Sequence, residues 1–329
     1  MIPPPRTRDS RNFDPRISGD TGDGAALPRA EPDTYYGLPV IKAAPWRWYV
    51  PAYFYLGGVA GAAATLATAA ELARDPHLAR RLRWIASLGE ASGAVCLIAD
   101  LGMPARFHHM MRVFRPTSPM NIGTWILSAA SVSGGLALLD DLRGQRNRRD
   151  RHRRQGPAAT SAISALTGAM LATYTAVLLG NTAVPIWDAT RRVLPPWFAA
   201  TSAASLASLL ELLGAAPRPV RRYAVAAKAG ELVAAHTVAR AAAAARVDRP
   251  LREGLSGRLW RGARWLGIAG LAATLLHRPR LAGALGTAAA VIGRFAIVEA
   301  GRSSAGDPRA TFEPQRRGAG QPHSDKRLP

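Results

Sequence analysis

The apolar residues of this chain fall into long blocks that are separated by short polar segments. A transmembrane helix needs about 20 mostly apolar residues, and eight blocks approach or reach that length. They cover residues 50–70, 84–102, 120–139, 158–180, 197–216, 223–245, 263–277 and 281–300. The seventh block is short unless its helix begins near Leu255. The pattern therefore predicts an all-α integral membrane protein, a bundle of about eight transmembrane helices.

The two ends of the chain lack such blocks. Residues 1–34 are rich in Pro, Gly, Asp and Arg and hold no apolar run of signal-peptide length, so we expect a disordered tail. Residues 302–329 are also polar and are expected to form a C-terminal tail. The transmembrane domain is therefore predicted to span residues 35–301.

Charge follows the same division. The chain has 43 lysines and arginines against 22 aspartates and glutamates, and most of the cations are arginines between the apolar blocks or in the tails. This distribution is typical of membrane-protein loops, whereas a nucleic-acid-binding protein would spread its arginines along grooves and amphipathic faces. We therefore expect membrane lipid, and no nucleic acid, as a partner. In an eight-helix bundle the basic loops 143–154 and 240–264 lie on opposite sides, so they do not orient the chain.

Few residues in the chain are suited to hold a metal. Cys96 is the only cysteine and cannot form an internal disulfide, an iron–sulfur cluster or a structural zinc site. A haem held by two histidines needs them to face each other inside the bundle, and only His236 lies well inside a block. We therefore expect no haem, no iron–sulfur cluster and no other metal in this chain.

The segment between the second and third blocks holds the strongest candidate chemistry. An apolar block ends at Asp100, breaks at glycine and proline, and is followed by a short loop with Arg106 and the pair His108 and His109. Further polar and aromatic side chains at the start of the next block are expected at the same depth in the membrane: Ser118, Asn121, Thr124 and Trp125. A carboxylate, hydrogen-bonding groups and flat rings near the membrane face suit a quinone head group, whose protonation requires an acid/base group. Alternatively, Asp100 and Arg106 form a salt bridge that closes the loop.

Several ionisable residues lie inside the blocks, where a charge costs a few kcal/mol. Glu90 precedes Asp100 by ten residues, close to three helical turns, so both can face the bundle interior along a proton path. The alternative is a protonated Glu90 that hydrogen-bonds to a neighbouring helix. Lys228 and Glu231 are three residues apart and are expected to neutralise each other.

Two stretches of this region resemble the signature of the NrfD/polysulfide reductase membrane-subunit family, DLGRPxRF followed by PTSPMSxGSW. Here residues 100–107 read DLGMPARF and residues 111–125 read MRVFRPTSPMNIGTW. Residues 35–42 (YYGLPVIK) and 294–301 (RFAIVEAG) also match the family. Met103, Asn121 and Thr124 depart from it, since they stand where the family has Arg, Ser and Ser.

The resemblance implies an eight-span subunit, without a redox centre of its own, in a prokaryotic cell membrane. Such subunits bind menaquinone or ubiquinone near one membrane face and dock a ferredoxin-like iron–sulfur subunit there, which connects them to a molybdopterin-type catalytic subunit. Matching positions and the loop chemistry together assign these residues: Asp100, His108 and His109 for proton exchange, Tyr36, Tyr53, Arg106, Ser118, Asn121 and Trp125 for quinone binding, and Glu90 for a proton path.

The main hypothesis is therefore a quinone-interacting membrane subunit that exchanges electrons with an iron–sulfur partner and carries no catalytic centre of its own. Two alternatives remain open. The chain could be a purely structural anchor for a redox complex. It could also be a transporter, with Glu90, Lys228, Glu231 and His236 along one path.

Overall fold

The computed structural model describes residues 41–146, 159–214, 217–307 and 310, all of which belong to one unit that comprises residues 39–329. The predicted disordered tail over residues 1–34 lies outside the described residues.

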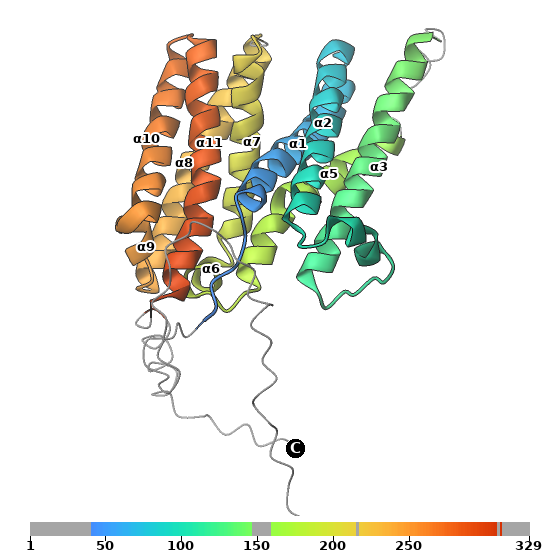
Figure 1. Cartoon of the computed structure of the whole chain (residues 1–329). Coiled ribbons are helices and arrows are strands. Elements are labelled where there is room, and N and C mark those ends of the chain that lie inside the picture. The colour runs from blue at the N-terminus through green and yellow to red at the C-terminus, as the bar shows by residue number, and fades with distance from the viewer. Residues whose placement is uncertain (1–40, 147–158, 215–216, 308–309, 311–329) are drawn as a thin grey trace, which may run out of the picture. The chain divides into compact units, whose positions relative to one another are not determined.

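Eight long helices dominate the described residues, and each overlaps one predicted apolar block (Figure 1). They are α1 (Tyr49–Leu72), α2 (Pro76–Asp100), α3 (Pro119–Arg146), α5 (Ala159–Gly180), α7 (Leu194–Leu212), α8 (Arg218–Ala244), α10 (Gly254–Leu275) and α11 (Pro279–Ala305). By length and composition, five of the described helices can cross a membrane: α1, α2, α3, α5 and α11. The all-α membrane fold is thus confirmed, while the count of eight membrane spans stays a prediction.

α10 and α11 are longer than the apolar blocks that predicted them. α10 begins at Gly254, so the seventh block does extend back past Leu255. α11 continues beyond the predicted domain end at residue 301 and stops at Ala305. The extra turn is buried because Gly301 packs directly on the Trp187 ring and the Ser304 hydroxyl accepts the backbone N–H of Ile186 at 3.2 Å. α11 therefore runs past residue 302, where the C-terminal tail was expected to begin.

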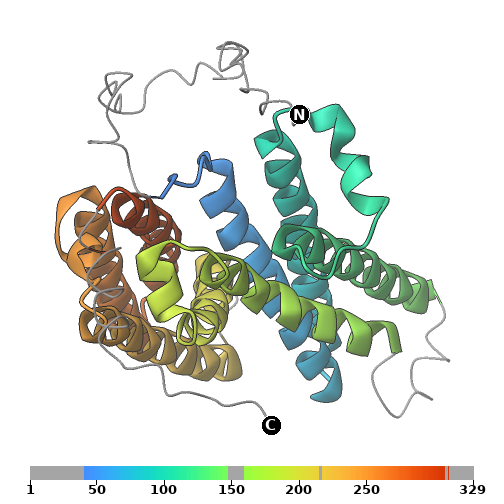
Figure 2. The same ribbon diagram turned by 90° about the horizontal axis from the view of Figure 1, so that it is seen from below.

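α1 lies between two groups of helices (Figures 1 and 2). On one side it packs on α2 and α5, which continue to α3. On the other side it packs on α7 and α11, which continue to α8 and α10. Close approach depends on small residues, since a methyl group at Gly61 of α1 would collide with the backbone of Gly168 in α5.

Three short helices lie at one end of this bundle: the 3₁₀ helix η2 (Pro104–Met111), α6 (Pro185–Thr190) and α9 (Arg249–Arg252) (Figure 1). An aromatic cluster fixes that end, with Trp46 stacked on Trp187 at 5.4 Å between ring centroids. We call it the η2 end. The opposite end, where α7 meets α8 and α10 meets α11, is called the α8 end.

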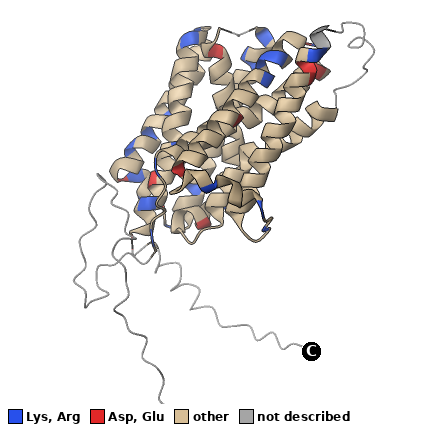
Figure 3. Cartoon of the chain, turned by 45° about the vertical axis from the view of Figure 1, so that its right-hand side comes forward, with Lys and Arg blue, Asp and Glu red and all other residues tan. Residues whose placement is uncertain are grey.

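Arginines and lysines gather at both ends of the bundle (Figure 3). α3 finishes its helix at the α8 end, while α8 finishes at the η2 end. α3 and α8 therefore end at opposite ends of the bundle, and the second basic segment, residues 240–264, is mostly helical because it includes the end of α8, all of α9 and the start of α10. Because both ends are basic, positive charge favours neither as the cytoplasmic one.

Candidate functional site

Asp100 is the last residue of α2 and is half-buried at the η2 end. Its Oδ1 accepts the backbone N–H of Arg47 at 3.3 Å, just before α1 begins. Arg106 instead lies exposed on η2, and no ion pair joins it to Asp100 in the described part of the chain. The alternative of a salt bridge between Asp100 and Arg106 is therefore not observed among the described residues, because Arg106 is exposed while the carboxylate binds the start of α1.

Asn121 holds the loop before α3 in shape. Its Oδ1 accepts the backbone N–H of Arg115 at 2.7 Å, and its Nδ2 donates to the carbonyl oxygens of Met110 and Val113 at 2.9 and 3.0 Å. The backbone N–H of Asn121 donates to the Ser118 hydroxyl at 3.4 Å. Both amide protons of Asn121 are thus used by backbone, which gives this residue a positioning role in the loop.

The two histidines of η2 stand side by side. The rings of His108 and His109 are 4.3 Å apart and nearly perpendicular, and both residues are exposed. Phe107 packs edge-on against His108 at 6.0 Å. With Arg106 on the same turn, η2 presents two imidazole groups and a guanidinium group to the outside of the bundle.

Trp125 lies behind this loop, in the first part of α3. Its ring meets Phe114 edge-on at 6.0 Å. The indole Nε1 of Trp125 is buried and has no hydrogen-bond partner in the described residues. Phe114 itself is 60% exposed. Leaving a buried N–H without an acceptor costs about 1–3 kcal/mol, so an acceptor that reached the Trp125 N–H would be stabilised by it.

A deeper set of polar groups lies between α1, α2, α3 and α5. Tyr53 is 3% exposed and packs against Gly93 of α2. Tyr174 packs on Gly123, and its hydroxyl has no partner among the described residues. Three tight glycine contacts therefore place these side chains: Gly93 against Tyr53, Gly123 against Tyr174, and Gly134 against Glu90.

Glu90 is the deepest carboxyl group of this set. It is 1% exposed, and neither of its side-chain oxygens has a hydrogen-bond partner within the described ranges. A methyl group at Gly134 would lie 2.7 Å from Glu90 Oε2, so the carboxyl group faces α3. The alternative of a Glu90 hydrogen bond to a neighbouring helix is thus not observed there. Asp100 turns toward the start of α1, so the two carboxyl groups do not face the same neighbour.

The other helix group holds an ion pair that differs from the predicted one. Lys228 Nζ lies 2.5 Å from Glu211 Oε2, and it also donates to Thr274 Oγ1 at 3.0 Å. Glu231, the predicted partner, instead accepts the Trp197 indole N–H at 3.4 Å. The predicted Lys228–Glu231 pair is therefore wrong. Spacing along α8 identified a possible neighbour, but the packing of α7 on α8 supplies a closer one.

Arg294 was not predicted to hold a structural position. It is 1% exposed, donates from Nη2 to the Phe198 carbonyl and the Ser202 hydroxyl, both at 3.2 Å, and lies 3.9 Å over the Phe198 ring. A cation over an aromatic face is stabilised by the ring quadrupole. Its presence inside an apolar block was the signal that could have identified it.

The remaining predicted residues do not form one group. His236 is exposed on α8, Lys228 is buried among α7, α8, α10 and α11, and Glu90 belongs to the other helix group. The four residues of the transporter hypothesis are thus not brought together in one path. Tyr36 lies outside the described residues.

Comparison with known proteins places the chain in a family. No curated protein matches the sequence. A protein family, NrfD_2, described as polysulfide reductase, matches residues 33–306. This range includes η2, the side chains described above at the η2 end, and every helix of the bundle that the structure describes. The chain therefore belongs to the NrfD_2 polysulfide reductase family, as a multi-pass membrane subunit of a redox complex.

Proposed function

We propose that the chain binds quinol or quinone at the η2 end and exchanges electrons with an iron–sulfur subunit docked on the same end. The observation that carries the proposal is the buried Trp125 N–H, which has no hydrogen-bond partner among the described residues and belongs to the helix that follows the segment with Asp100, His108 and His109. A quinone carbonyl oxygen is an acceptor of the kind this donor lacks.

The residues of the loop fit a flat, partly polar ring. Phe114 contacts Trp125 edge-on and is largely exposed, so a planar ligand can replace it against the indole. The Asp100 carboxylate lies at the same end of the bundle, at the end of α2. Menaquinone and ubiquinone share the two carbonyl groups that this recognition needs.

Proton exchange is assigned to Asp100 and the histidine pair. Oxidation of a quinol releases two electrons and two protons, and the protons require a base within reach. Asp100 Oδ1 is held by the Arg47 N–H at 3.3 Å, which orients the carboxylate at the end of α2. The exposed imidazoles of His108 and His109 can then pass protons to water.

Glu90 extends the proposal toward the membrane interior. It precedes Asp100 by ten residues, which is about 15 Å along a helix. Its carboxyl group is buried without a partner among the described residues, as expected for a proton carrier and unlike a structural ion pair. We assign Glu90 to a proton path that starts behind the quinone site.

The outer face of the loop is proposed to meet the ferredoxin-like subunit, which connects to a molybdopterin-type catalytic subunit. Two features support it: the exposed cations Arg106 and Arg112, and exposed apolar side chains beside them. The apolar residues are Met103, Phe107, Val113 and Phe114, which are 46–60% exposed. Apolar groups mixed with arginine are typical of protein interfaces.

A purely structural anchor is the second candidate, and the hydrogen bonds of the loop favour it. Asp100 ties α2 to the start of α1, and Asn121 closes the loop before α3. Both residues would keep these roles in a subunit that only holds its partner at the membrane.

Asp100→Asn distinguishes the two candidates. The amide oxygen still accepts the Arg47 N–H, so folding and assembly are retained while the acid/base group is lost. In the purified complex we expect quinol-linked turnover to fall about 100-fold or more, with unchanged activity toward an artificial electron donor. Asp188→Asn, which alters an exposed carboxylate paired with Arg191, is the matched control. Full quinol turnover in Asp100→Asn would refute the quinone assignment and leave the anchor.

A further inference from the structure

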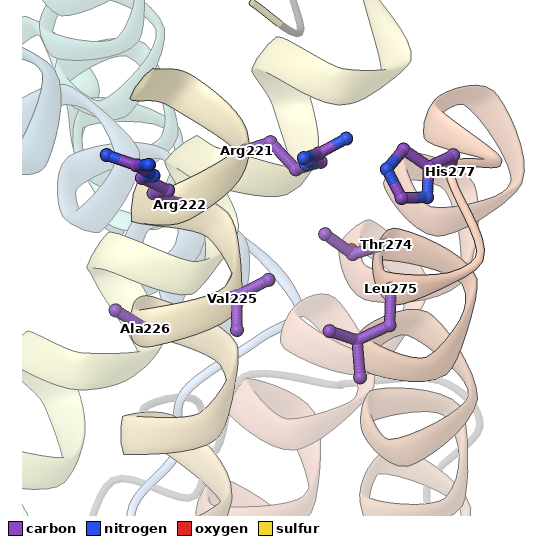
Figure 4. A pocket seen from close by; sticks show the side chains of 7 residues that line it. All are labelled: Arg221, Arg222, Val225, Ala226, Thr274, Leu275 and His277. Carbon is purple, nitrogen blue, oxygen red and sulfur yellow. The ribbon is translucent and has the colours of Figure 1, made fainter. Parts of the chain in front are cut away.

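An open cavity of about 350 Å³ lies at the α8 end, between α8 and α10 (Figure 4). Its lining residues are Arg221, Arg222, Val225, Ala226, Thr274, Leu275 and His277. Arg221 extends from α8 toward His277, which stands on the turn after α10. The cavity is at the opposite end of the bundle from the proposed quinone site.

The mouth of this cavity carries positive charge that no neighbouring carboxylate in the described residues neutralises. No carboxylate lines it, and neither Arg221 nor Arg222 has a side-chain hydrogen bond or ion pair with another residue that the structure describes. Glu211 of the adjacent α7 is buried and already bound to Lys228. Two guanidinium groups are thus free to bind an anion, and His277 adds a ring N–H donor in either protonation state.

The floor of the cavity is apolar and opens toward the outside of the bundle. Val225 lies one helical turn below Arg221, and Leu275 faces it from α10, while Ala226 lies below Arg222 on the side of α8 away from α10 (Figure 4). Leu275 is 57% exposed and the following Leu276 is 72% exposed. Exposed leucines at the end of membrane helices suit contact with hydrocarbon, so the cavity combines an anion-binding mouth with an apolar floor.

We propose that this cavity binds an anionic phospholipid, with the phosphate held between Arg221 and His277, Arg222 at the rim, and an acyl chain along Val225 and Leu275. Arginine forks bind phosphate oxygens in pairs, and basic pockets between membrane helices are suited to lipid head groups. A free phosphate would satisfy the arginines but would leave the apolar floor unused. The bound lipid would fix the tilt of α8 against α10.

The test uses the full chain, purified in detergent and incorporated into lipid nanodiscs, with bound lipid counted by native mass spectrometry. The probes are phosphatidylglycerol and phosphatidylcholine. We expect at least about tenfold preference for phosphatidylglycerol, lost in the double variant Arg221→Gln/Arg222→Gln. The matched control is Arg218→Gln/Arg280→Gln, which removes the same charge from exposed positions of the same end outside the cavity.

Two further measurements distinguish a lipid site from a site for a free anion. Val225→Trp fills the apolar floor without changing charge and should also abolish phosphatidylglycerol retention. Retained binding in Val225→Trp, or displacement of the lipid by millimolar inorganic phosphate, would show a free-anion site and overturn the lipid proposal. Equal loss in the cavity variant and in its charge-matched control would show a general surface-charge effect and overturn it as well. Circular dichroism of each variant checks the helical fold.

Discussion

The buried pair Lys228–Glu211 gives a direct test of how the second helix group is held together. Glu211 is 1% exposed, Lys228 is 3% exposed, and their charged atoms are 2.5 Å apart. The Lys228 ammonium donates to Glu211 Oε2, to Thr274 Oγ1 at 3.0 Å and to the Ala282 carbonyl at 3.1 Å, with the Gly270 carbonyl farther away at 3.5 Å. The pair thus joins α7 and α8 to α10 and α11.

Glu211→Gln keeps an oxygen acceptor but leaves the ammonium without a counter-charge. Removing one partner of a buried ion pair typically costs about 3–5 kcal/mol. A cavity of about 20 Å³ beside Lys228, lined also by Thr201, Ser208 and Glu231, is large enough for about one water molecule, which would solvate the stranded ammonium. We therefore expect a loss near the lower limit, about 3 kcal/mol.

The double variant Lys228→Met/Glu211→Leu removes both charges and keeps similar volume. Replacement of a buried pair by apolar residues is often neutral or stabilising, so we expect this variant to recover most of the stability. Unfolding in detergent, followed by helical circular dichroism, measures each free energy. Asp188→Asn, which breaks an exposed pair with Arg191, is the control and should cost less than about 1 kcal/mol.

Two results would contradict the stabilising role of the Lys228–Glu211 pair. A Glu211→Gln loss below about 1 kcal/mol would show that the Lys228 ammonium does not depend on its carboxylate. A double variant as unstable as the single one would show that volume and packing, rather than the unpaired charge, set the cost.

The remaining predictions concern packing and the loop. Gly61→Ala should lower stability by about 1–3 kcal/mol because its methyl group collides with the Gly168 backbone, whereas Gly135→Ala, with open space around it, should change stability by less than about 0.5 kcal/mol. Thermal unfolding in detergent compares the two, and equal effects would contradict the close α1–α5 contact. Asn121→Ala removes three hydrogen bonds to loop backbone and should increase amide hydrogen exchange around Met110 and Arg115, while exchange in α7 stays unchanged. Unchanged exchange in the loop would contradict its positioning role.

The order of apolar and polar residues along the chain was sufficient to predict the long helices and the position of the loop after Asp100. Apolar blocks about as long as a bilayer is thick predicted every long described helix, because each helix satisfies its backbone hydrogen bonds internally and needs only a continuous apolar run. Glycine and proline after Asp100 predicted where α2 stops, since neither residue favours a helix interior. The family motif in residues 100–125 identified the polysulfide reductase family, which the comparison confirmed.

Which group each buried or half-buried polar side chain binds was decided by the tertiary structure. Lys228 pairs with Glu211, 17 residues away, rather than with Glu231 on its own helix, and Asp100 binds the Arg47 backbone, 53 residues away, rather than Arg106. Spacing along one helix shows which groups share a face, but it carries no information on what the neighbouring helix brings to that face. The Arg221–His277 cavity has the same origin, because it exists only where the start of α8 lies beside the end of α10.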